Sequence, residues 1–242
     1  MDALTDIDVV ILAGGFGTRL QSVLPDRQKV VADISGRPFL AFLIEDFARA
    51  GCRRVILALG HRAEQVMDLL APYRPAGVEI VASVEPEPLG TGGAARLALA
   101  QTRSRRLLLT NGDSFLPVDH AQLVAAHIVA GAAATLVVTA VDSVARYGEV
   151  VVAEDGAIHA FREKQDAGDR PGLINAGRYL IEREALEILP RDRPASLERD
   201  LFPALCGGAL YAFQQDGPFI DIGTPDSLRS ASRYFESLGA SA

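Results

Sequence analysis

Cysteine is scarce in this chain of 242 residues, which contains two, Cys52 and Cys206. Both stand alone, with no CxxC pair and no closely spaced cysteine framework. Neither a thiolate metal site nor a disulfide-stapled secreted scaffold is therefore expected. Isolated cysteines usually pack as small apolar side chains, and we interpret both in that way.

Targeting and membrane signals are also missing. Residues 1–6, Met-Asp-Ala-Leu-Thr-Asp, are acidic and lack the basic and apolar regions of a signal peptide. No apolar run approaches the roughly 18 residues that a membrane span needs. We therefore expect a cytoplasmic protein with no membrane partner.

An excess of positive charge is absent as well. The chain has 24 Lys and Arg against 31 Asp and Glu, a net charge of −7. Such a chain has no basic footprint for nucleic acid. A polyanionic ligand must instead meet backbone N–H groups, a few local cations or a metal ion. With 49% apolar residues, the chain has ample material for a folded core.

The first half alternates apolar runs with helical patterns, which is typical of a doubly wound, mostly parallel α/β sheet with helices on both faces. Residues 9–12, Val-Val-Ile-Leu, form a continuous apolar run, as expected for a strand buried on both faces. The other expected strands are 55–59, 78–81, 107–109 and 135–138, and the expected helices are 39–50, 63–70, 94–100 and 121–130.

The second half changes style. Residues 149–152 and 157–161 are expected to form a β-hairpin across the Asp-Gly turn at 155–156. Further expected elements are strands 174–181, 210–213 and 219–222, helices 182–189 and 197–205, and a last helix opened by Pro225. No Pro-, Gly- or Ser-rich linker and no repeat occurs. We expect one domain over 1–242, with a substrate-binding lobe contributed by roughly the second half.

A glycine-rich loop follows the first expected strand. Gly14, Gly15 and Gly17 allow a tight turn that aims backbone N–H groups at an anion, and Arg19 offers a fork suited to phosphate. Lys29 could reach the same phosphates. The loop is neither the dinucleotide GxGxxG motif nor a GxxxxGK[ST] P-loop. The alternative is a plain turn in which glycines serve packing.

Two acidic residues and one segment of small residues complete the candidate site. Asp113 follows the fourth expected strand, where open α/β sheets bind ligands, and Asp221 lies in an apolar strand. Mg²⁺ prefers one or two carboxylates with phosphate oxygens and water, which suits this pair if the fold brings them together. The small residues of 89–94, Leu-Gly-Thr-Gly-Gly-Ala, would let a flat ligand lie against backbone groups; a flexible loop with a helix N-terminus is the alternative.

Together these segments resemble the sugar-1-phosphate nucleotidylyltransferase family. The resemblance rests on residues 12–20 with Lys29, on 89–94, on the Gly-Asp step at 113 and on Asp221-Ile222-Gly223-Thr224-Pro225. The family usually has Pro directly before the lysine, whereas this chain has Gln28. The resemblance implies that Arg19, Lys29 and Asp113 are catalytic and that Asp113 and Asp221 hold Mg²⁺. It implies a nucleotide site of Leu12, Ala13, Gly14, Gly15, Gly17, Thr18, Arg19, Lys29, Glu85, Leu89, Gly90, Thr91, Asn111, Gly112 and Asp113.

The same resemblance implies a nucleotide-binding half at about 1–140 and a sugar-phosphate-binding half at about 141–242. The sugar-phosphate segments here are Tyr147-Gly148-Glu149, Phe161-Arg162-Glu163-Lys164 and Asn175-Ala176-Gly177. Lys164 would hold the sugar phosphate, and polar groups would hold the hydroxyls. The residues expected to bind the sugar phosphate are Gly148, Glu163, Lys164, Asn175 and Gly177.

The resemblance implies that a sugar 1-phosphate reacts with a nucleoside triphosphate and releases pyrophosphate. Residues 12–20, 36–40 and 221–225 are similar to D-glycero-α-D-manno-heptose-1-phosphate guanylyltransferases, so GTP and that heptose phosphate, for a bacterial surface glycan, are favoured. Mannose 1-phosphate with GTP is the first alternative, and glucose 1-phosphate with UTP or dTTP the next. A non-catalytic nucleotide-sugar sensor is disfavoured because Arg19, Asp113 and Asp221 are all present. The sequence leaves a homodimer open.

Overall fold

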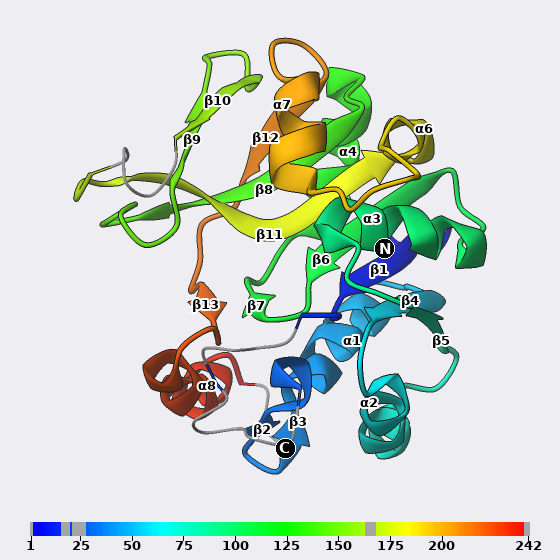
Figure 1. The fold of residues 1–242 in the computed structure, drawn as a ribbon. Coiled ribbons are helices and arrows are strands. Elements are labelled where there is room, and N and C mark those ends of the chain that lie inside the picture. The colour runs from blue at the N-terminus through cyan, green and yellow to red at the C-terminus, as the bar shows by residue number, and fades with distance from the viewer. Residues whose placement is uncertain (1, 16–19, 21–27, 163–167, 240–242) are drawn as a thin grey trace.

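The computed structural model describes residues 2–15, 20, 28–162 and 168–239. Its centre is a seven-stranded sheet in the order β12-β8-β11-β6-β1-β4-β5 (Figure 1). Every neighbouring pair is parallel except those of β11, which runs antiparallel between β6 and β8. The strands are β1 Asp8–Leu12, β4 Arg54–Leu59, β5 Glu79–Val84, β6 Arg106–Asn111, β8 Ala134–Val141, β11 Gly172–Glu182 and β12 Leu210–Gln214.

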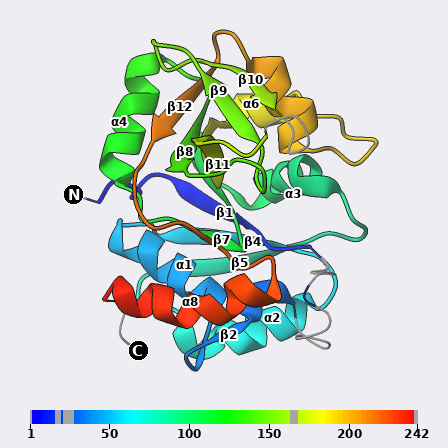
Figure 2. The same cartoon turned by 90° about the vertical axis from the view of Figure 1, so that its left-hand side faces the viewer.

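Helices cover both faces of this sheet, so the expected doubly wound α/β fold is confirmed (Figure 2). Alternate side chains of β1 explain the two layers: Val9 and Ile11 pack into one apolar cluster, and Val10 into the other. One cluster includes α1 Phe39–Arg49, α2 Ala63–Leu70, α4 His120–Ala130 and α8 Pro225–Ser237, and the other includes α3 Gly90–Ala98, α6 Arg183–Glu187 and α7 Phe202–Leu205.

Three two-stranded pairs lie outside the main sheet. The expected hairpin is present as β9 Glu149–Val152 and β10 Ile158–Arg162. β2 Asp33–Ile34 pairs with β3 Arg37–Pro38, and β7 Ser114–Phe115 pairs with β13 Ile220–Asp221. The last pair joins the end of the first half to a segment near the end of the chain, which positions one of the predicted acids.

Local sequence signals fix several helix boundaries. The Asp119 side chain accepts a hydrogen bond from Gln122 N at 3.0 Å to start α4, and Gly131, at φ +58°, ends it. Pro225 stands in the first turn of α8, as predicted, behind a Thr224–Ser227 capping box. The predicted helix 197–205 is instead a π-helical turn, Leu197–Leu201, followed by α7. None of the helices in the described ranges has the length and apolar character needed to span a bilayer.

Candidate active site

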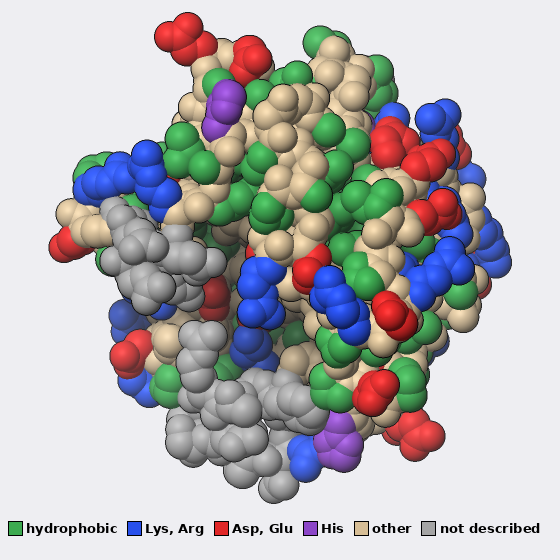
Figure 3. All heavy atoms as spheres, turned by 45° about the horizontal axis from the view of Figure 1, so that its top comes forward, with side chains coloured by type: hydrophobic (Ala, Val, Ile, Leu, Met, Phe, Trp, Pro, Cys, Tyr) green, Lys and Arg blue, Asp and Glu red, His purple; other side chains and the backbone are tan. Residues whose placement is uncertain are grey.

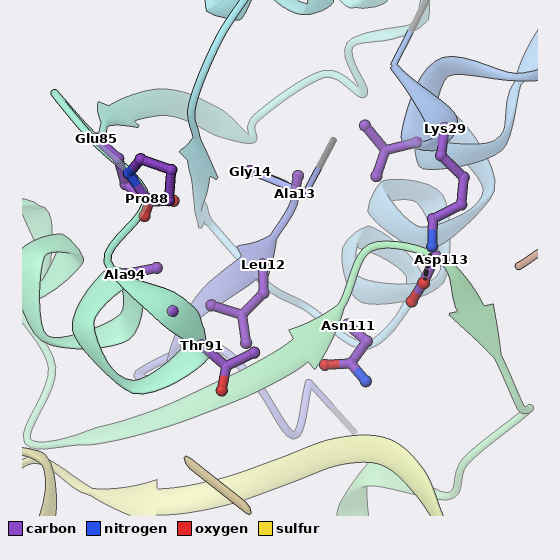
Figure 4. A pocket seen from close by; sticks show the side chains of 13 residues that line it. Leu12, Ala13, Gly14, Lys29, Glu85, Pro88, Thr91, Ala94, Asn111 and Asp113 are labelled. Carbon is purple, nitrogen blue, oxygen red and sulfur yellow. Dashed lines mark hydrogen bonds and ion pairs between the residues drawn. The ribbon is translucent and has the colours of Figure 1, made fainter. Parts of the chain in front are cut away.

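A cavity of about 330 Å³ opens beside the carboxyl ends of β1 and β6 and the start of α3 (Figure 4). Parallel strands of an open α/β sheet place ligand sites at this edge, and the sequence predicts a nucleotide here. The cavity joins segments that are far apart in the chain. Its lining is Leu12, Ala13, Gly14, Gly15, Lys29, Val30, Glu85, Pro88, Gly90, Thr91, Ala94, Asn111 and Asp113.

The start of the glycine-rich loop is fixed against two neighbouring strands. Ala13 N donates to the carbonyl oxygen of Ala58 at 2.9 Å. A Cβ atom on Gly14 would collide with the Glu85 carboxylate and lie 3.4 Å from Gly60 N, so position 14 requires glycine. The expected phosphate ligands Gly17, Thr18 and Arg19 lie outside the described residues.

Glu85 forms one wall of the cavity directly after β5. Its Oε2 accepts a hydrogen bond from Leu89 N at 2.9 Å, which folds the segment back toward α3. Burial raises the pKa of the Glu85 carboxyl, and the Leu89 N–H partly offsets this shift. Oε1 lies against Gly14, where the loop begins. Glu85 thus presents a partly desolvated acceptor at the end of the cavity farthest from Lys29 and Asp113 (Figure 4).

The segment before α3 differs from the sequence prediction. The helix begins at Gly90 rather than residue 94, because the carbonyl oxygen of Ala195 accepts hydrogen bonds from Gly92 N and Gly93 N at 2.8 and 3.2 Å. Ala195 N in turn donates to Leu89 O at 2.8 Å. The Ala195 segment thus occupies Gly92 N, Gly93 N and Leu89 O, and a base contact at Leu89, Gly90 and Thr91 stays a prediction.

The end of β6 carries the polar residues closest to the phosphate loop. Gly112 N donates to Leu12 O at 2.9 Å, and a Cβ at position 112 would lie 2.9 Å from that oxygen. Glycine therefore lets β1 and β6 stay side by side past their ends. The following residue, Asp113, forms an ion pair with Lys29, so the structure brings two of the predicted catalytic residues together.

Asp221 approaches Asp113 through the β7–β13 pair. Asp221 lies opposite Ser114 in this pair, and Ile222 N donates to the Asp113 carbonyl oxygen at 2.9 Å. The Oδ1 atom of Asp221 accepts a hydrogen bond from Gly223 N at 2.5 Å. The two acids are therefore neighbours across a short ladder, although they are far apart in sequence.

This donor set fits Mg²⁺ that arrives with a phosphate ligand. Asp113 lines the cavity and Asp221 lies on the adjoining strand, and Mg²⁺ takes its remaining ligands from phosphate oxygens and water. Within the described ranges no cluster of three or more His, Cys, Asp or Glu side chains forms a self-sufficient metal cage. Asp113 and Asp221 would hold the ion, and the predicted pair stays a prediction.

The predicted sugar segment on β11 lies beside the same end of the cavity. Gly177 has φ +76°, and a Cβ there would lie 2.8 Å from Asn111 Nδ2 and 2.7 Å from Ser114 Oγ. The strand register shifts between Asn175 and Tyr179, and Asn175 Oδ1 accepts a hydrogen bond from Gly177 N at 2.8 Å. This bulge sets the Asn175 amide close to the end of β6.

The remaining sugar residues are only partly described. Gly148, at φ +82°, closes a turn through a 2.9 Å hydrogen bond from its N–H to Val144 O. Burial raises the pKa of the neighbouring Tyr147, and the negative charge of Asp221 adds to this rise, which places the turn near the acid pair. Glu163 and Lys164 lie outside the described residues.

Several site residues were not predicted from the sequence. Val30, Pro88 and Ala94 line the cavity, although none of them was assigned to the nucleotide. Each lies next to a predicted site residue or within the segment 89–94. Tyr179 is fully buried behind Asn175, whose Nδ2 donates to the Tyr179 hydroxyl at 3.1 Å. Glu198 contacts Thr91 from the second half of the chain, and no local pattern marks it.

Charged side chains of both signs lie on the face of the molecule shown in Figure 3. Lys and Arg side chains lie beside a hollow in the middle of the face shown in Figure 3. Local cations are therefore available for an anionic ligand on this face, although the whole chain carries a net charge of −7.

Comparison with known proteins agrees with this geometry. A sequence model described as Nucleotidyl transferase matches residues 8–237. A Drosophila pseudoobscura pseudoobscura protein named mannose-1-phosphate guanylyltransferase catalytic subunit beta is 37% identical over 234 residues, which are 95% of this chain and 62% of that protein. The chain thus spans less than two thirds of the length of that relative.

A second relative and two solved structures extend the comparison. A D-glycero-alpha-D-manno-heptose 1-phosphate guanylyltransferase from Aneurinibacillus thermoaerophilus is 34% identical over 231 residues, 95% of this chain and 99% of that protein. HddC from Yersinia pseudotuberculosis, crystallised with GMP-PN, is 34% identical with a TM-score of 0.84 over 95% of this chain and 99% of that one. A putative glucose-1-phosphate thymidylyltransferase from Bacillus anthracis, at 20% identity and a TM-score of 0.81 over 94% of each chain, shows the shared fold.

Proposed function

The chain belongs to the nucleotidyl transferase family, and from this premise we propose that it is a sugar-1-phosphate guanylyltransferase. The observation that carries the proposal is one cavity with a carboxylate at one end and an ion-paired lysine and aspartate at the other. A nucleoside triphosphate has the same polarity, with a base at one end and phosphates at the other. The glycine loop lies between them.

Guanine is the base that suits the Glu85 end. An ionised carboxylate only accepts hydrogen bonds, and guanine carries an exocyclic amine donor beside its ring N–H. Glu85 has one oxygen held by Leu89 N and its other oxygen at the cavity wall. Uracil and thymine lack the amine donor, so UTP and dTTP are weaker candidates. The HddC relative was crystallised with a nucleotide analogue, GMP-PN, which supports the same choice.

For the sugar we propose D-glycero-α-D-manno-heptose 1-phosphate, used for a bacterial surface glycan. The similarity of residues 12–20, 36–40 and 221–225 to that subgroup and the named Aneurinibacillus relative support it. Mannose 1-phosphate is the second candidate, because the Drosophila relative at 37% identity is named for it. Both sugars have the manno configuration, so the pocket has to distinguish them at the far end of the ring.

In the proposed reaction an oxygen of the sugar 1-phosphate attacks the α-phosphorus of GTP. The bond from the α-phosphorus to the bridging oxygen breaks, and pyrophosphate leaves. No protein nucleophile is needed, so the residues act by positioning and charge neutralisation. Lys29 would stabilise the departing pyrophosphate together with Arg19, and Lys164 would align the attacking phosphate. The Asn175 amide and the Gly177 backbone would hold the sugar.

Mg²⁺ bound by Asp113 and Asp221 would supply charge neutralisation at the reacting phosphates. Two contacts support this proposed metal site. The β7–β13 ladder holds the two acids as neighbours, and Lys29 pairs with Asp113. When the ligand binds, Lys29 can exchange its carboxylate partner for a phosphate oxygen.

A pyrophosphate-release assay tests the proposal. Four triphosphates are each combined with the heptose phosphate, mannose 1-phosphate and glucose 1-phosphate. We expect turnover to need Mg²⁺, to be highest with GTP and to favour a manno-configured sugar. Highest turnover with UTP or dTTP would contradict the base assignment, and nucleotide binding without pyrophosphate release would favour a regulatory subunit instead.

A further inference from the structure

A segment of the second half of the chain is hydrogen bonded across the start of α3. In addition to the Ala195 contacts, Leu197 N donates to Thr91 Oγ1 at 2.9 Å. The fit is tight, because a Cβ on Gly90 would lie 2.5 Å from the Ala195 carbonyl oxygen. The segment continues as the π-helical turn Leu197–Leu201, a rare conformation that often occurs at functional sites.

Thr91 stands at the centre of this contact and also lines the cavity. Its hydroxyl donates its one proton to Glu198 Oε2 at 2.8 Å and accepts the hydrogen bond from Leu197 N. A threonine hydroxyl has one proton and two lone pairs. One lone pair therefore remains, and the hydroxyl can act toward a ligand only as an acceptor.

Glu198 fixes this state of Thr91. Its Oε2 also accepts a hydrogen bond from Ser196 Oγ at 2.8 Å. Its Oε1 has no partner among the described residues and is not buried. Burial raises the pKa of Tyr179, and the nearby charges of Glu198 and Asp113 add to the rise. Glu198 thus contacts a residue that lines the cavity, and its charge also acts on Tyr179, whose hydroxyl accepts the hydrogen bond from Asn175 Nδ2.

We propose that Glu198 is a positioning residue that, by holding the Thr91 proton, makes Thr91 an acceptor for a hydroxyl of a bound sugar. The inference rests on the proposed function. The hydroxyl belongs either to the ribose of the nucleotide or to the ring of the sugar phosphate, and the chemistry is the same in both cases. A ligand that lacks this hydroxyl leaves the acceptor of Thr91 without a partner inside the site.

Calorimetric titration and steady-state kinetics distinguish the two sources. GTP, 2′-deoxy-GTP and 3′-deoxy-GTP are titrated into the wild type, Glu198→Ala and Glu198→Gln, and the KM for D-glycero-α-D-manno-heptose 1-phosphate is measured for each protein. If the ribose is the source, the Glu198→Ala variant binds GTP about tenfold more weakly than the wild type. It also binds GTP no more tightly than the one deoxy analogue that lacks the hydroxyl in question. If the sugar phosphate is the source, its KM rises about tenfold while GTP binding is unchanged.

Two variants separate a positioning role from a folding role, and they are measured in the same way. Glu198→Gln keeps an acceptor oxygen for Thr91 and should restore most of the loss. Asp200→Asn is the matched control, because the Asp200 carboxylate accepts a 2.7 Å hydrogen bond from Ser196 N in the same turn but does not contact Thr91. It should leave the discrimination and both affinities near the wild-type values.

Three results would overturn the inference. The first is wild-type GTP affinity and sugar KM in Glu198→Ala, and the second is an equal loss in Asp200→Asn. The third is a Glu198→Gln variant as impaired as Glu198→Ala. A wild-type chain that binds no GTP would overturn the proposed function itself, which keeps the two failures distinguishable.

Discussion

The backbone N–H of Ile222 donates a hydrogen bond to the carbonyl oxygen of Asp113 at 2.9 Å, and this contact makes Asp113 and Asp221 neighbours. The two-residue ladder of β7 and β13 supplies the rest of the link. Two acids that stand far apart in the chain thus lie on adjoining backbone segments, and Asp113 also lines the cavity.

Neutralising either acid should remove catalysis without unfolding the chain. Asp113→Asn and Asp221→Asn keep side-chain size but lose the charge that would hold Mg²⁺. We expect pyrophosphate release to fall on the order of a hundredfold or more in each variant. Asp226→Asn, an exposed acid in the first turn of α8, is the control and should keep wild-type turnover. Near wild-type activity in either site variant would remove that acid from the metal site.

Gly177→Ala should lower both stability and sugar-phosphate binding. The position has φ +76°, and a methyl group would meet Ser114 Oγ and Asn111 Nδ2 at 2.7 and 2.8 Å. We expect a loss of about 1–3 kcal/mol in the free energy of unfolding, measured with urea, and a raised sugar-phosphate KM.

Gly77→Ala separates the two causes of that loss. Gly77 has φ +80°, but nothing lies within 4 Å of a Cβ built there. The Gly77→Ala variant should lose roughly 1 kcal/mol in the free energy of unfolding because of the backbone conformation, and its sugar-phosphate KM should be unchanged. Equal effects at positions 77 and 177 would mean that the close approach to Asn111 does not matter.

Glu85 should make GTP binding depend on pH. Burial raises the pKa of its carboxyl, so in the folded protein it gains a proton at a higher pH than an ordinary glutamate. Only the ionised form accepts two donors from guanine. We expect GTP affinity to fall as the pH is lowered toward 5. Glu85→Gln should bind GTP more weakly at pH 8 and lose this component of the pH dependence.

The protonation of GTP itself does not confound that comparison. The phosphates titrate equally for both proteins, so the ratio of the two affinities isolates Glu85. A ratio that stays constant from pH 8 to pH 5 would contradict the assignment of Glu85 to the base.

His120 should make the fold sensitive to acid. Burial lowers its pKa to about 3, with the Arg178 guanidinium as the second cause. Its Nε2 accepts a hydrogen bond from Arg178 Nη1 at 3.0 Å, and Asp46 and Asp119 also face it. The unfolded chain therefore takes up the proton first as the pH falls. The contribution of neutral His120 to the free energy of unfolding is fully present above pH 6.5. It is lost as the pH falls from 6.5 to 3, by up to about 1.4 kcal/mol per pH unit.

Urea unfolding at several pH values checks this slope. His120→Gln keeps an acceptor for Arg178 but does not titrate, so its slope between pH 6.5 and 4 should be smaller than that of the wild type. His159→Gln, at an exposed position on β10, should keep the wild-type slope. His127 is buried with a lowered pKa and contributes a slope of its own in all three proteins.

The sheet and one side of the cavity could be predicted because their signals are local. The apolar run at Val9 to Leu12 marks a strand buried on both faces, and Gly14 and Asp113 stand where strands of such a sheet end. The hairpin at β9 and β10 followed from its Asp-Gly turn. In each case a few consecutive residues carry the whole physical reason.

The contacts that complete the site depend on distant parts of the chain. The Ala195 carbonyl oxygen accepts hydrogen bonds in the first turn of α3, so that the helix begins at Gly90. The residues near position 90 do not predict this earlier start. Arg178 is another example, because its buried guanidinium pairs with Asp46 on α1 at 3.1 Å. A short stretch of sequence around Gly90 or Arg178 does not include the distant partner. Sequence patterns therefore missed the start of α3 and this buried ion pair.

A crystal structure with a non-hydrolysable GTP analogue and Mn²⁺ in place of Mg²⁺ tests the central claim most directly. The anomalous signal of Mn²⁺ locates the ion independently of the nucleotide. We predict an anomalous peak between the carboxylates of Asp113 and Asp221, with phosphates beside Lys29 and guanine against Glu85. A peak away from these acids, or a nucleotide bound outside this cavity, would contradict the account.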